Sequence, residues 1–356
     1  MMVSAPRNGV PSEHGHLAEL PDDDPAWLEL VAEAPDATAF HLPAWARAVA
    51  GTYGYSSAVL AHRDRSGRVA AGIPVARVRR FSGRALVSLP FTDRCAPLAR
   101  DDESLGSLAA GVVDWSRRHG LPVEVRGAIP ATPGWTQVVA GVEHVLDLRA
   151  GAESLRGRFS ATHRRWLRQA ERSGLHVRIG RSADEMETFY GLHLLTRRRQ
   201  GVPVQPRRFF DAIWRHLIAP GHGAVLLARM PDGRAVAGMV VLASNGTAIV
   251  KFQASDATSW QLRPNHLCCW TAIRWAADTG HRRLEFGRTE TRHAGLQQWK
   301  AGWGGDAVPL TYSTTGEGSR DLGAHGLLDA ALGHVIRRSP AAVCQALGAL
   351  LYRYAA

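Results

Sequence analysis

The chain has 356 residues, of which 45% are hydrophobic and 21% are charged. This length and apolar content suffice for two domains with cores, and they exclude a wholly disordered protein. No apolar run approaches the ~20 residues that a membrane-spanning helix needs. The first residues also lack the basic and apolar segments of a signal peptide. We therefore expect a cytoplasmic protein.

The positive charge is strong and unevenly placed. The chain has 43 basic and 32 acidic residues, a net charge of +11, and its only lysines are Lys251 and Lys300. Residues 1–40 carry a net charge of −7, whereas residues 156–215 carry +9. Such a basic region predicts an anionic partner: RNA, a phosphorylated small molecule or a membrane surface. The alternative is a solvated surface that offsets the acidic N-terminal arm.

The first half of the chain begins with an arm rich in Pro, Gly, His and Ser over residues 1–22. Helical spacing and helix-start signals then predict two helices, near 25–33 and from Pro43 to about residue 51. Turn residues separate three strands, which a longer helix and two further strands follow. We expect these strands at 57–62, 69–78 and 85–89, the helix at 104–119, and the last strands at 122–126 and 143–148.

The second half repeats this order. Helices are predicted at 160–172, 183–200 and from Pro206, and the strand 175–179 follows the first of them. Three strands come next, at 224–228, 235–243 and 247–253, and Asn245-Gly246 between the last two is a strong hairpin signal. A helix then starts at Pro264 and precedes a strand at 283–286, a short helix and a strand at 308–313.

This repeated order predicts an α+β fold made of two similar domains, each with a mixed sheet flanked by helices. We expect a first domain over residues 23–150 and a second over 151–320, which carries the functional site. Residues 321–356 are expected to form C-terminal helices that pack back on the first domain. The order of three strands, a helix and a strand is that of the GNAT acyltransferase superfamily, although a fold does not fix a function.

The densest group of chemically useful residues follows the strand 283–286, and loops at strand ends often carry binding and catalytic residues. Lys300 lies there between Trp299 and Trp303, where its ammonium group could stabilise an oxyanion or hold a phosphate. It could equally be a surface lysine whose stem lies on a tryptophan. Glu285 and Arg288 could act in proton transfer or form a structural ion pair. Further candidates for substrate binding are Trp299, Asn265, Trp270, Asp256, Arg198 and Arg199.

The predicted helix 160–172 has arginines at helical spacing, and guanidinium groups match phosphate oxygens well. The residues expected to bind phosphate or tRNA are Arg164, Arg165, Arg168 and Arg172, with Arg207 and Arg208 extending the same surface. No motif that reads a DNA sequence accompanies them, so we expect no DNA partner.

Several absences narrow the chemistry. The four cysteines, Cys95, Cys268, Cys269 and Cys344, lack metal-ligand spacing, so we expect neither a zinc site nor a disulfide framework. There is no phosphate-binding P-loop, dinucleotide-binding loop or serine nucleophile elbow. The Arg/Gln-x-x-Gly-x-Gly/Ala turn with which ordinary GNAT enzymes hold coenzyme A is also absent before the helix at Pro264. This absence weakens an acyl-CoA donor without excluding it.

Over about residues 40–355 the chain resembles the FemAB-like branch of the GNAT superfamily, which includes the aminoacyltransferases of peptidoglycan bridges. The resemblance is carried by the segments Leu262–Asn265, Trp270–Ala276, Leu284–Thr289 and Trp299–Gly304, and then by Thr162–Ala170 and Thr196–Pro203. Weaker matches are Phe40–Trp45 and Leu86–Phe91.

The resemblance implies two GNAT-like domains with a cleft between them. It also implies the transfer of an acyl group, typically an amino acid from aminoacyl-tRNA, to an amine. The family's aromatic–lysine pair matches Trp299-Lys300, which implies that Lys300 aids the transition state. Members that grip a cell-wall nucleotide have a lysine near the first-domain tryptophan, whereas this chain has only Arg47 near Trp45. The acceptor could thus be a peptidoglycan precursor, another cell-surface metabolite or a natural-product amine.

We therefore predict an amide-forming acyltransferase in which Lys300 stabilises the oxyanion and Glu285, Arg288 and Asn265 line the site. The expected donor is aminoacyl-tRNA, and we expect no tightly bound cofactor. One alternative is a GNAT-type N-acyltransferase that uses acyl-CoA. The other is a protein without catalytic activity that binds RNA or an anionic surface.

Overall fold

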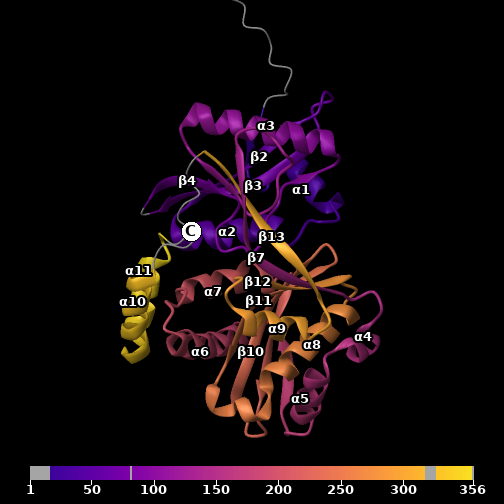
Figure 1. The fold of residues 1–356 in the computed structure, drawn as a ribbon, viewed down its shortest axis with the longest axis vertical. Coiled ribbons are helices and arrows are strands. Elements are labelled where there is room, and N and C mark those ends of the chain that lie inside the picture. The colour runs from indigo at the N-terminus through magenta and orange to yellow at the C-terminus, as the bar shows by residue number, and fades with distance from the viewer. Residues whose placement is uncertain (1–16, 81, 317–325, 355–356) are drawn as a thin grey trace, which may run out of the picture.

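The computed structural model describes residues 17–80, 82–316 and 326–354, with side chains given from residue 332 onward in the last range. The first half contains β1 (Leu17–Leu20), α1 (Pro25–Glu33), α2 (Pro43–Tyr53), β2 (Ser56–Arg63), β3 (Val69–Arg80), β4 (Gly83–Val87), β5 (Leu98–Ala99), α3 (Asp102–His119), β6 (Val123–Val125) and β7 (Trp135–Asp147). The predicted helices and strands of this half are present, and β7 is much longer than expected (Figure 1).

The second half follows the predicted order. Its elements are α4 (Ala152–Arg158), α5 (Ala161–Glu171), β8 (His176–Gly180), α6 (Ala183–Gln200), α7 (Arg207–Ile213), β9 (Gly223–Arg229), β10 (Ala235–Ser244), β11 (Thr247–Ser255), the 3-10 helix η3 (Ala257–Leu262), α8 (Pro264–Asp278), β12 (Arg283–Thr289), α9 (Ala294–Ala301), β13 (Asp306–Thr315), α10 (Gly326–Arg338) and α11 (Ala341–Leu351). The Asn245-Gly246 pair makes the predicted tight turn between β10 and β11, with φ of 47° and 76° at its two residues.

The strands form one continuous mixed sheet in the order β1-β2-β3-β4-β6-β13-β7-β12-β11-β10-β9-β8. In each half, the third strand of an antiparallel meander pairs in parallel with the strand after a crossover helix: β4 with β6, and β11 with β12. The two halves then exchange a strand. β7 lies beside β12 of the second half, and β13 lies beside β6 of the first. The α+β prediction of two similar units is confirmed, but the sheet is shared.

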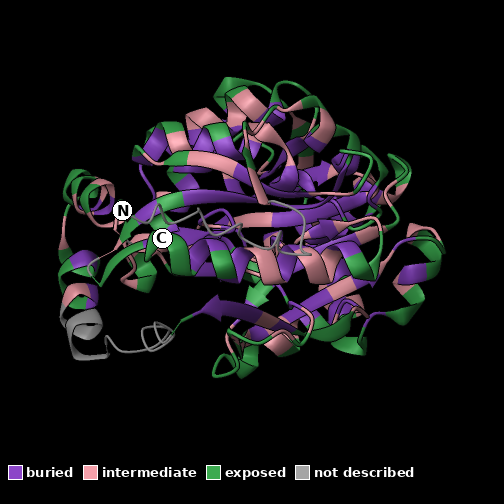
Figure 2. Ribbon diagram, turned by 90° about the horizontal axis from the view of Figure 1, so that it is seen from above, coloured by how far each residue is buried: buried purple, intermediate pink, exposed green. Residues whose placement is uncertain are grey.

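Helices cover both faces of the sheet, and Figure 2 shows the buried strands between them. On β9–β11, helices α6 and α7 pack on one face, and α5 and α8 pack on the other. The first face continues into the first half, because Trp45 of α2 contacts Phe209 of α7 with ring centroids 5.8 Å apart. The core under α6, α7 and α2 therefore belongs to both halves.

The C-terminal helices α10 and α11 lie beside α6 of the second half. The chain end after α11 reaches the first half, where the Tyr55 hydroxyl donates to the backbone oxygen of Arg353 at 2.9 Å. The segment expected to pack on the first domain thus contacts both halves. Among the described residues, no helix is long and apolar enough to cross a membrane.

Candidate functional site

The site is built where β11 and β12 diverge. These strands pair only over Thr247–Ile249 and Arg283–Glu285, although β11 continues to Ser255 and β12 to Thr289. Asp93, from the loop after β4, lies at this point, since its carboxylate is 3.3 Å from the ammonium group of Lys251 on β11. On the β12 side, a Cβ atom added to Gly287 (φ 70°) would lie 2.9 Å from Oδ2 of Asp93. Gly287 thus allows the close approach of the loop.

The backbone of this loop is unusual. Leu89 and Phe91 have positive φ angles of 51° and 63°, a conformation that costs energy for side chains of this kind. The Tyr312 hydroxyl of β13 donates to the backbone oxygen of Asp93 at 2.9 Å. A segment of the first half is therefore held in a strained conformation that places Asp93 among residues of the second half.

Both lysines of the chain act on Asp93. Lys251 is nearly buried, and its ammonium group lies 5.3–5.7 Å from the ring centres of Phe40, Trp45 and Phe252. Burial lowers the pKa of Lys251, and the carboxylate of Asp93 opposes this shift. Burial alone would raise the pKa of Asp93, but the charges of Lys251 and Lys300 hold it below its ordinary value. The aspartate is therefore charged and compensates buried ammonium groups.

Lys300 of α9 is 6% exposed, and its Nζ donates to the backbone oxygens of Gly287 at 2.7 Å and of Arg288 at 3.4 Å. Burial lowers its pKa to about 8, although the nearby charges of Asp93 and Glu143 favour the ammonium form. An ammonium group has three N–H donors. Two of these are used within the described structure, which leaves one for another acceptor.

Two buried glutamates, Glu143 and Glu285, lie next to these residues. Together they form the charged cluster, which consists of Asp93, Arg94, Glu143, Lys251, Glu285 and Lys300. Arg94 joins the glutamates: its Nη2 lies 2.8 Å from Glu285 Oε1, and its Nε lies 3.6 Å from Glu143 Oε2. Glu285 has a second partner in Arg283, at 3.4 Å. Burial and the negative charge of Glu285 raise the pKa of Glu143. Glu143 is thus the carboxyl group of the cluster that most readily holds a proton.

Three predicted residues meet here. Lys300 and Glu285 belong to the charged cluster, and Arg288 lies beside them on β12, with its Nη1 donating to the backbone oxygen of Ala140 at 3.2 Å. Trp299 is partly buried and contacts Trp303, with ring centroids 5.8 Å apart. Trp270 is 3% exposed and packs on Phe159 in the core under α8. Its ring therefore supports the fold and does not line the divergence of β11 and β12.

A second group of predicted residues gathers around Ser255, at the end of β11. The Asn265 side-chain amide donates to its hydroxyl at 3.1 Å, and a guanidinium N–H of Arg199 donates to its backbone oxygen at 3.1 Å. Asp256 caps η3 and lies 3.3 Å from Arg234. The Oδ1 atom of Asn265 is buried and has no hydrogen-bond partner among the described residues. Arg198 precedes Arg199 on α6 and is partly exposed.

The predicted phosphate-binding arginines do not share one surface, so the expectation of a single basic surface is wrong. Helix α5, with Arg164, Arg165, Arg168 and Arg172, packs beside α8, whereas α7, with Arg207 and Arg208, covers the opposite face of the sheet. Arg164 donates to the backbone oxygens of Gly157 and Phe159 at the end of α4, so its guanidinium group stabilises a helix end. Arg207 pairs with Glu187 at 2.9 Å.

Asp93, Arg94, Glu143 and Lys251 are cluster members that were not among the predicted site residues. Lys251 carried a usable signal, because it is the other lysine of an arginine-rich chain. The other three belong to the first half and lie more than 140 residues before Glu285 or Lys300 in sequence. Nothing local marks them, since only the shared sheet brings them to the site.

No group of three or more potential metal ligands occurs within the described ranges. The four cysteines are buried and unpaired. Burial raises the pKa of the Cys95 and Cys268 thiols to about 12, and raises that of Cys269 well above its ordinary value. These thiols are therefore poor nucleophiles.

Residues 157–301 match the family model of the acetyltransferase (GNAT) domain. A crystal structure of FemX is similar to this chain, with a TM-score of 0.68, 13% identity and coverage of 84% of this chain and 96% of that chain. The C-terminal domain of a putative lysylphosphatidylglycerol synthetase from Agrobacterium fabrum has a TM-score of 0.57 and 16% identity, and the match covers 86% of this chain and 95% of that one.

A tandem GNAT protein from the clavulanic acid biosynthesis pathway has a TM-score of 0.52 and 15% identity, with 86% of this chain and 99% of that chain covered. No curated protein sequence matches the chain. The three structures share the fold of this chain, and the family match falls on the half that supplies β11, β12 and Lys300. Residues 157–301 thus match a GNAT acetyltransferase domain, and the chain as a whole shares the fold of FemX and of the tandem GNAT protein.

Proposed function

We propose that this protein is an acyltransferase, which forms an amide by moving an amino acid from aminoacyl-tRNA to an amine. The observation that carries this proposal is the nearly buried ammonium group of Lys300 at the divergence of β11 and β12, with a lowered pKa and one N–H donor to spare. A fixed donor in a desolvated site stabilises the negative charge of a tetrahedral intermediate better than water does.

In the proposed step, the amine nitrogen attacks the ester carbonyl carbon and the carbonyl oxygen takes up negative charge. Lys300 donates to this oxygen. The bond from the carbonyl carbon to the ribose oxygen then breaks, the amide forms, and the proton lost by the amine balances the proton gained by the leaving hydroxyl. Of the two buried glutamates, Glu143 suits this proton exchange because its pKa is raised, whereas Glu285 is held by two arginines.

The segment between β11 and α8 supports a donor other than acyl-CoA. Residues 247–279 contain no glycine, and the segment forms the 3-10 helix η3, capped by Asp256, in place of a glycine-rich turn. The Asp256 side chain already accepts from the backbone N–H of Thr258. At the divergence itself, Asp93 of the first half pairs with Lys251.

A basic and aromatic surface beside η3 fits RNA. The guanidinium group of Arg199 lies 4.5 Å from the ring centre of Trp260, and that of Arg263 lies 4.6 Å from the ring centre of Trp166. Trp260 is 45% exposed, and Arg165 on α5 is also exposed. Exposed tryptophans between arginines bind single-stranded nucleic acid by stacking and by phosphate contacts. We infer that this surface receives the donor.

The similar structures favour the same reaction class. One of them is named as a putative lysylphosphatidylglycerol synthetase, and that name denotes a product that carries an amino acid. The acyl-CoA alternative is favoured by the GNAT domain match itself and by the similar tandem GNAT structure.

A label-transfer experiment separates the candidates. The protein is incubated with a small-molecule extract as the source of amines, together with either tRNA charged with labelled amino acids or labelled acetyl-CoA. Amides survive mild alkali, whereas aminoacyl esters do not. We expect alkali-stable label from charged tRNA. Label from acetyl-CoA alone would establish the acyl-CoA alternative, and binding of tRNA without label from either donor would indicate a non-catalytic RNA-binding protein.

The RNA surface is tested by filter binding of charged tRNA at two salt concentrations. The double variant Arg165→Gln/Arg263→Gln is expected to bind at least tenfold more weakly and to show a smaller salt dependence, because two phosphate contacts are lost. Arg207→Gln, on the opposite face of the sheet, is the matched control and should bind like the wild type. Equal affinities for the double variant and the wild type would contradict the assignment of this surface.

A further inference from the structure

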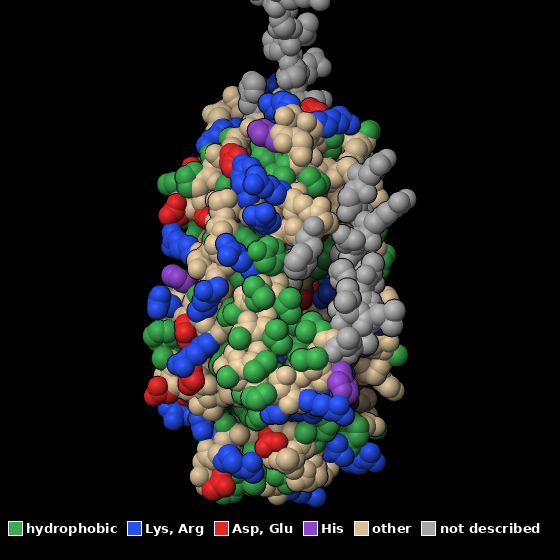
Figure 3. Space-filling model, turned by 90° about the vertical axis from the view of Figure 1, so that its left-hand side faces the viewer, with side chains coloured by type: hydrophobic (Ala, Val, Ile, Leu, Met, Phe, Trp, Pro, Cys, Tyr) green, Lys and Arg blue, Asp and Glu red, His purple; other side chains and the backbone are tan. Residues whose placement is uncertain are grey.

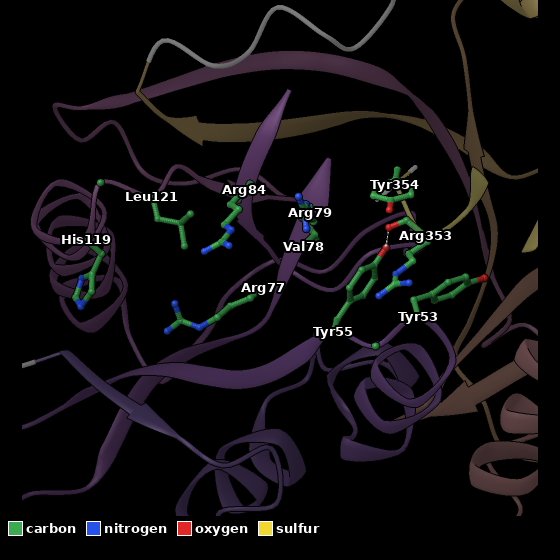
Figure 4. Close-up of a pocket in the computed structure, with 13 residues that line it drawn as sticks. Tyr53, Tyr55, Arg77, Val78, Arg79, Arg84, His119, Leu121, Arg353 and Tyr354 are labelled. Atoms are coloured by element: carbon green, nitrogen blue, oxygen red, sulfur yellow. Dashed lines mark hydrogen bonds between the residues drawn. The ribbon is translucent and has the colours of Figure 1, made fainter. Parts of the chain in front are cut away.

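A hollow of about 880 Å³ lies in the first half, at the tip of the β3–β4 hairpin. Its lining includes Arg77, Arg79, Arg84, Arg353 and His119, and no aspartate or glutamate. Figure 4 shows the side chains of Arg77 and Arg84 extending from the hairpin toward the side on which His119 lies. On the other side, Arg353 lines the hollow together with Tyr53 and Tyr55. Figure 3 shows basic side chains gathered on the upper part of one face of the molecule.

The register of the hairpin makes this concentration of charge unfavourable for the stability of the strand pair. Arg79 lies directly opposite Arg84 across the two strands, and Arg77 lies two residues away on the same face as Arg79. Like charges in directly opposed positions destabilise a strand pair. Within the described part of the chain, Arg79, Arg84 and Arg353 form no ion pair with a carboxylate, while Arg77 pairs with Glu19 at 2.9 Å. The fold therefore leaves most of this positive charge uncompensated.

Three distant parts of the sequence build the hollow. The hairpin supplies three arginines, the end of α3 supplies His119, and the hydrogen bond from Tyr55 to the backbone of Arg353 holds the chain end against β2. The rings of Tyr53 and Tyr55 stack at 5.8 Å and give one side an aromatic wall. The volume is within the range of small-molecule sites.

We propose that this hollow binds a small organic phosphate, with Arg77, Arg79 and Arg84 contacting phosphate oxygens. Guanidinium groups match phosphate geometry in paired hydrogen bonds, and an anion between Arg79 and Arg84 replaces their mutual repulsion by attraction. This proposal does not depend on the proposed reaction. The hollow is nevertheless connected to the charged cluster, because Tyr53 contacts Phe91 at 4.6 Å between ring centroids and Phe91 lies two residues before Asp93.

Isothermal titration calorimetry with inorganic pyrophosphate and with ADP tests the proposal. The wild-type protein is expected to bind both probes. Arg79→Gln and Arg84→Gln should each weaken binding at least tenfold, and the double variant should show no measurable heat. Arg65→Gln, at the exposed turn at the opposite end of β3, is the matched control and should bind as the wild type does.

Two further measurements keep the outcome unambiguous. Without ligand, Arg84→Gln should melt at the same temperature as the wild type or higher, since it relieves the repulsion, so lost binding cannot come from unfolding. Lys300→Ala should bind pyrophosphate normally, which separates this site from the proposed reaction. The proposal would be overturned if the double variant bound pyrophosphate and ADP with wild-type affinity. It would also be overturned if the double variant lost only the binding of tRNA.

Discussion

Replacing Lys300 by alanine is expected to lower the rate of acyl transfer about 10²–10³-fold, the usual effect of removing one donor that stabilises an oxyanion. The substitution removes the only side-chain ammonium group that donates to the β12 backbone at Gly287 and Arg288 within the described structure. These two backbone oxygens lose their partner, which costs about 1–3 kcal/mol of unfolding free energy. Single-turnover rates and urea unfolding curves should therefore both be measured.

Two variants control this prediction. Gln298→Ala alters an exposed residue on the same helix and should leave the rate unchanged. Lys300→Arg keeps the positive charge but replaces a compact ammonium by a larger planar group, and we expect it to restore only a small part of the rate. A full rate in Lys300→Arg, or in a folded Lys300→Ala variant, would refute the assigned role.

Replacing Asp93 by alanine is expected to lower the free energy of unfolding by about 3–5 kcal/mol, because it leaves the nearly buried Lys251 without its carboxylate partner. Chemical unfolding measures this loss. Adding Lys251→Met to the same chain should recover most of it, since a methionine suits the rings of Phe40, Trp45 and Phe252 better than an unpaired ammonium does.

The control for Asp93 is an aspartate in an exposed ion pair. Asp23 lies 2.8 Å from Arg47, with 61% of its side chain exposed, so Asp23→Ala should cost no more than about 1 kcal/mol. If Asp93→Ala were as mild as this control, or if the second substitution failed to restore stability, the Asp93–Lys251 pair would not hold the loop at the site.

Local signals in the sequence located most helices and strands, because turn and capping residues mark their ends. Asn245-Gly246 fixes the turn before β11, Pro264 starts α8, and Gly120 ends α3 in a left-handed conformation. The parallel pairs that follow the crossover helices also agree with the predicted α+β order. These features depend on residues close together in the chain, so one sequence suffices to read them.

The exchange of β7 and β13 between the two halves could not be predicted from local signals in the sequence. β7 pairs with β12 and β13, strands that begin more than 130 residues after it ends, and no local pattern records such a pairing. The expected boundary near residue 150 follows β7 in the chain, but β7 lies in the part of the sheet completed by the second half. The expected surface of arginines failed for a similar reason, because sequence proximity did not show that α5 and α7 lie on opposite faces.

Of the second-half members of the charged cluster, Glu285 and Lys300 were among the predicted site residues, whereas Lys251 was not. The rarity of lysine and the resemblance singled out Lys300, whose ammonium group donates to the backbone oxygen of Arg288. Asp93, Arg94 and Glu143 had no comparable signal, yet they set the charge balance around both lysines. A site assembled from two halves of a chain is thus visible in sequence only where unusual composition or a motif marks it.

The lowered pKa of the Lys300 ammonium group can be measured without knowing either substrate. The chain has only two lysines, so protein labelled at the lysine side-chain nitrogen gives two NMR signals, which the Lys251→Met variant assigns. The Lys300 signal is expected to titrate with a pKa of about 8, below the ordinary 10.5, because burial disfavours its charge. Oxyanion stabilisation should then disappear as the pH rises through about 8. A Lys300 signal that titrates at its ordinary value would contradict the account.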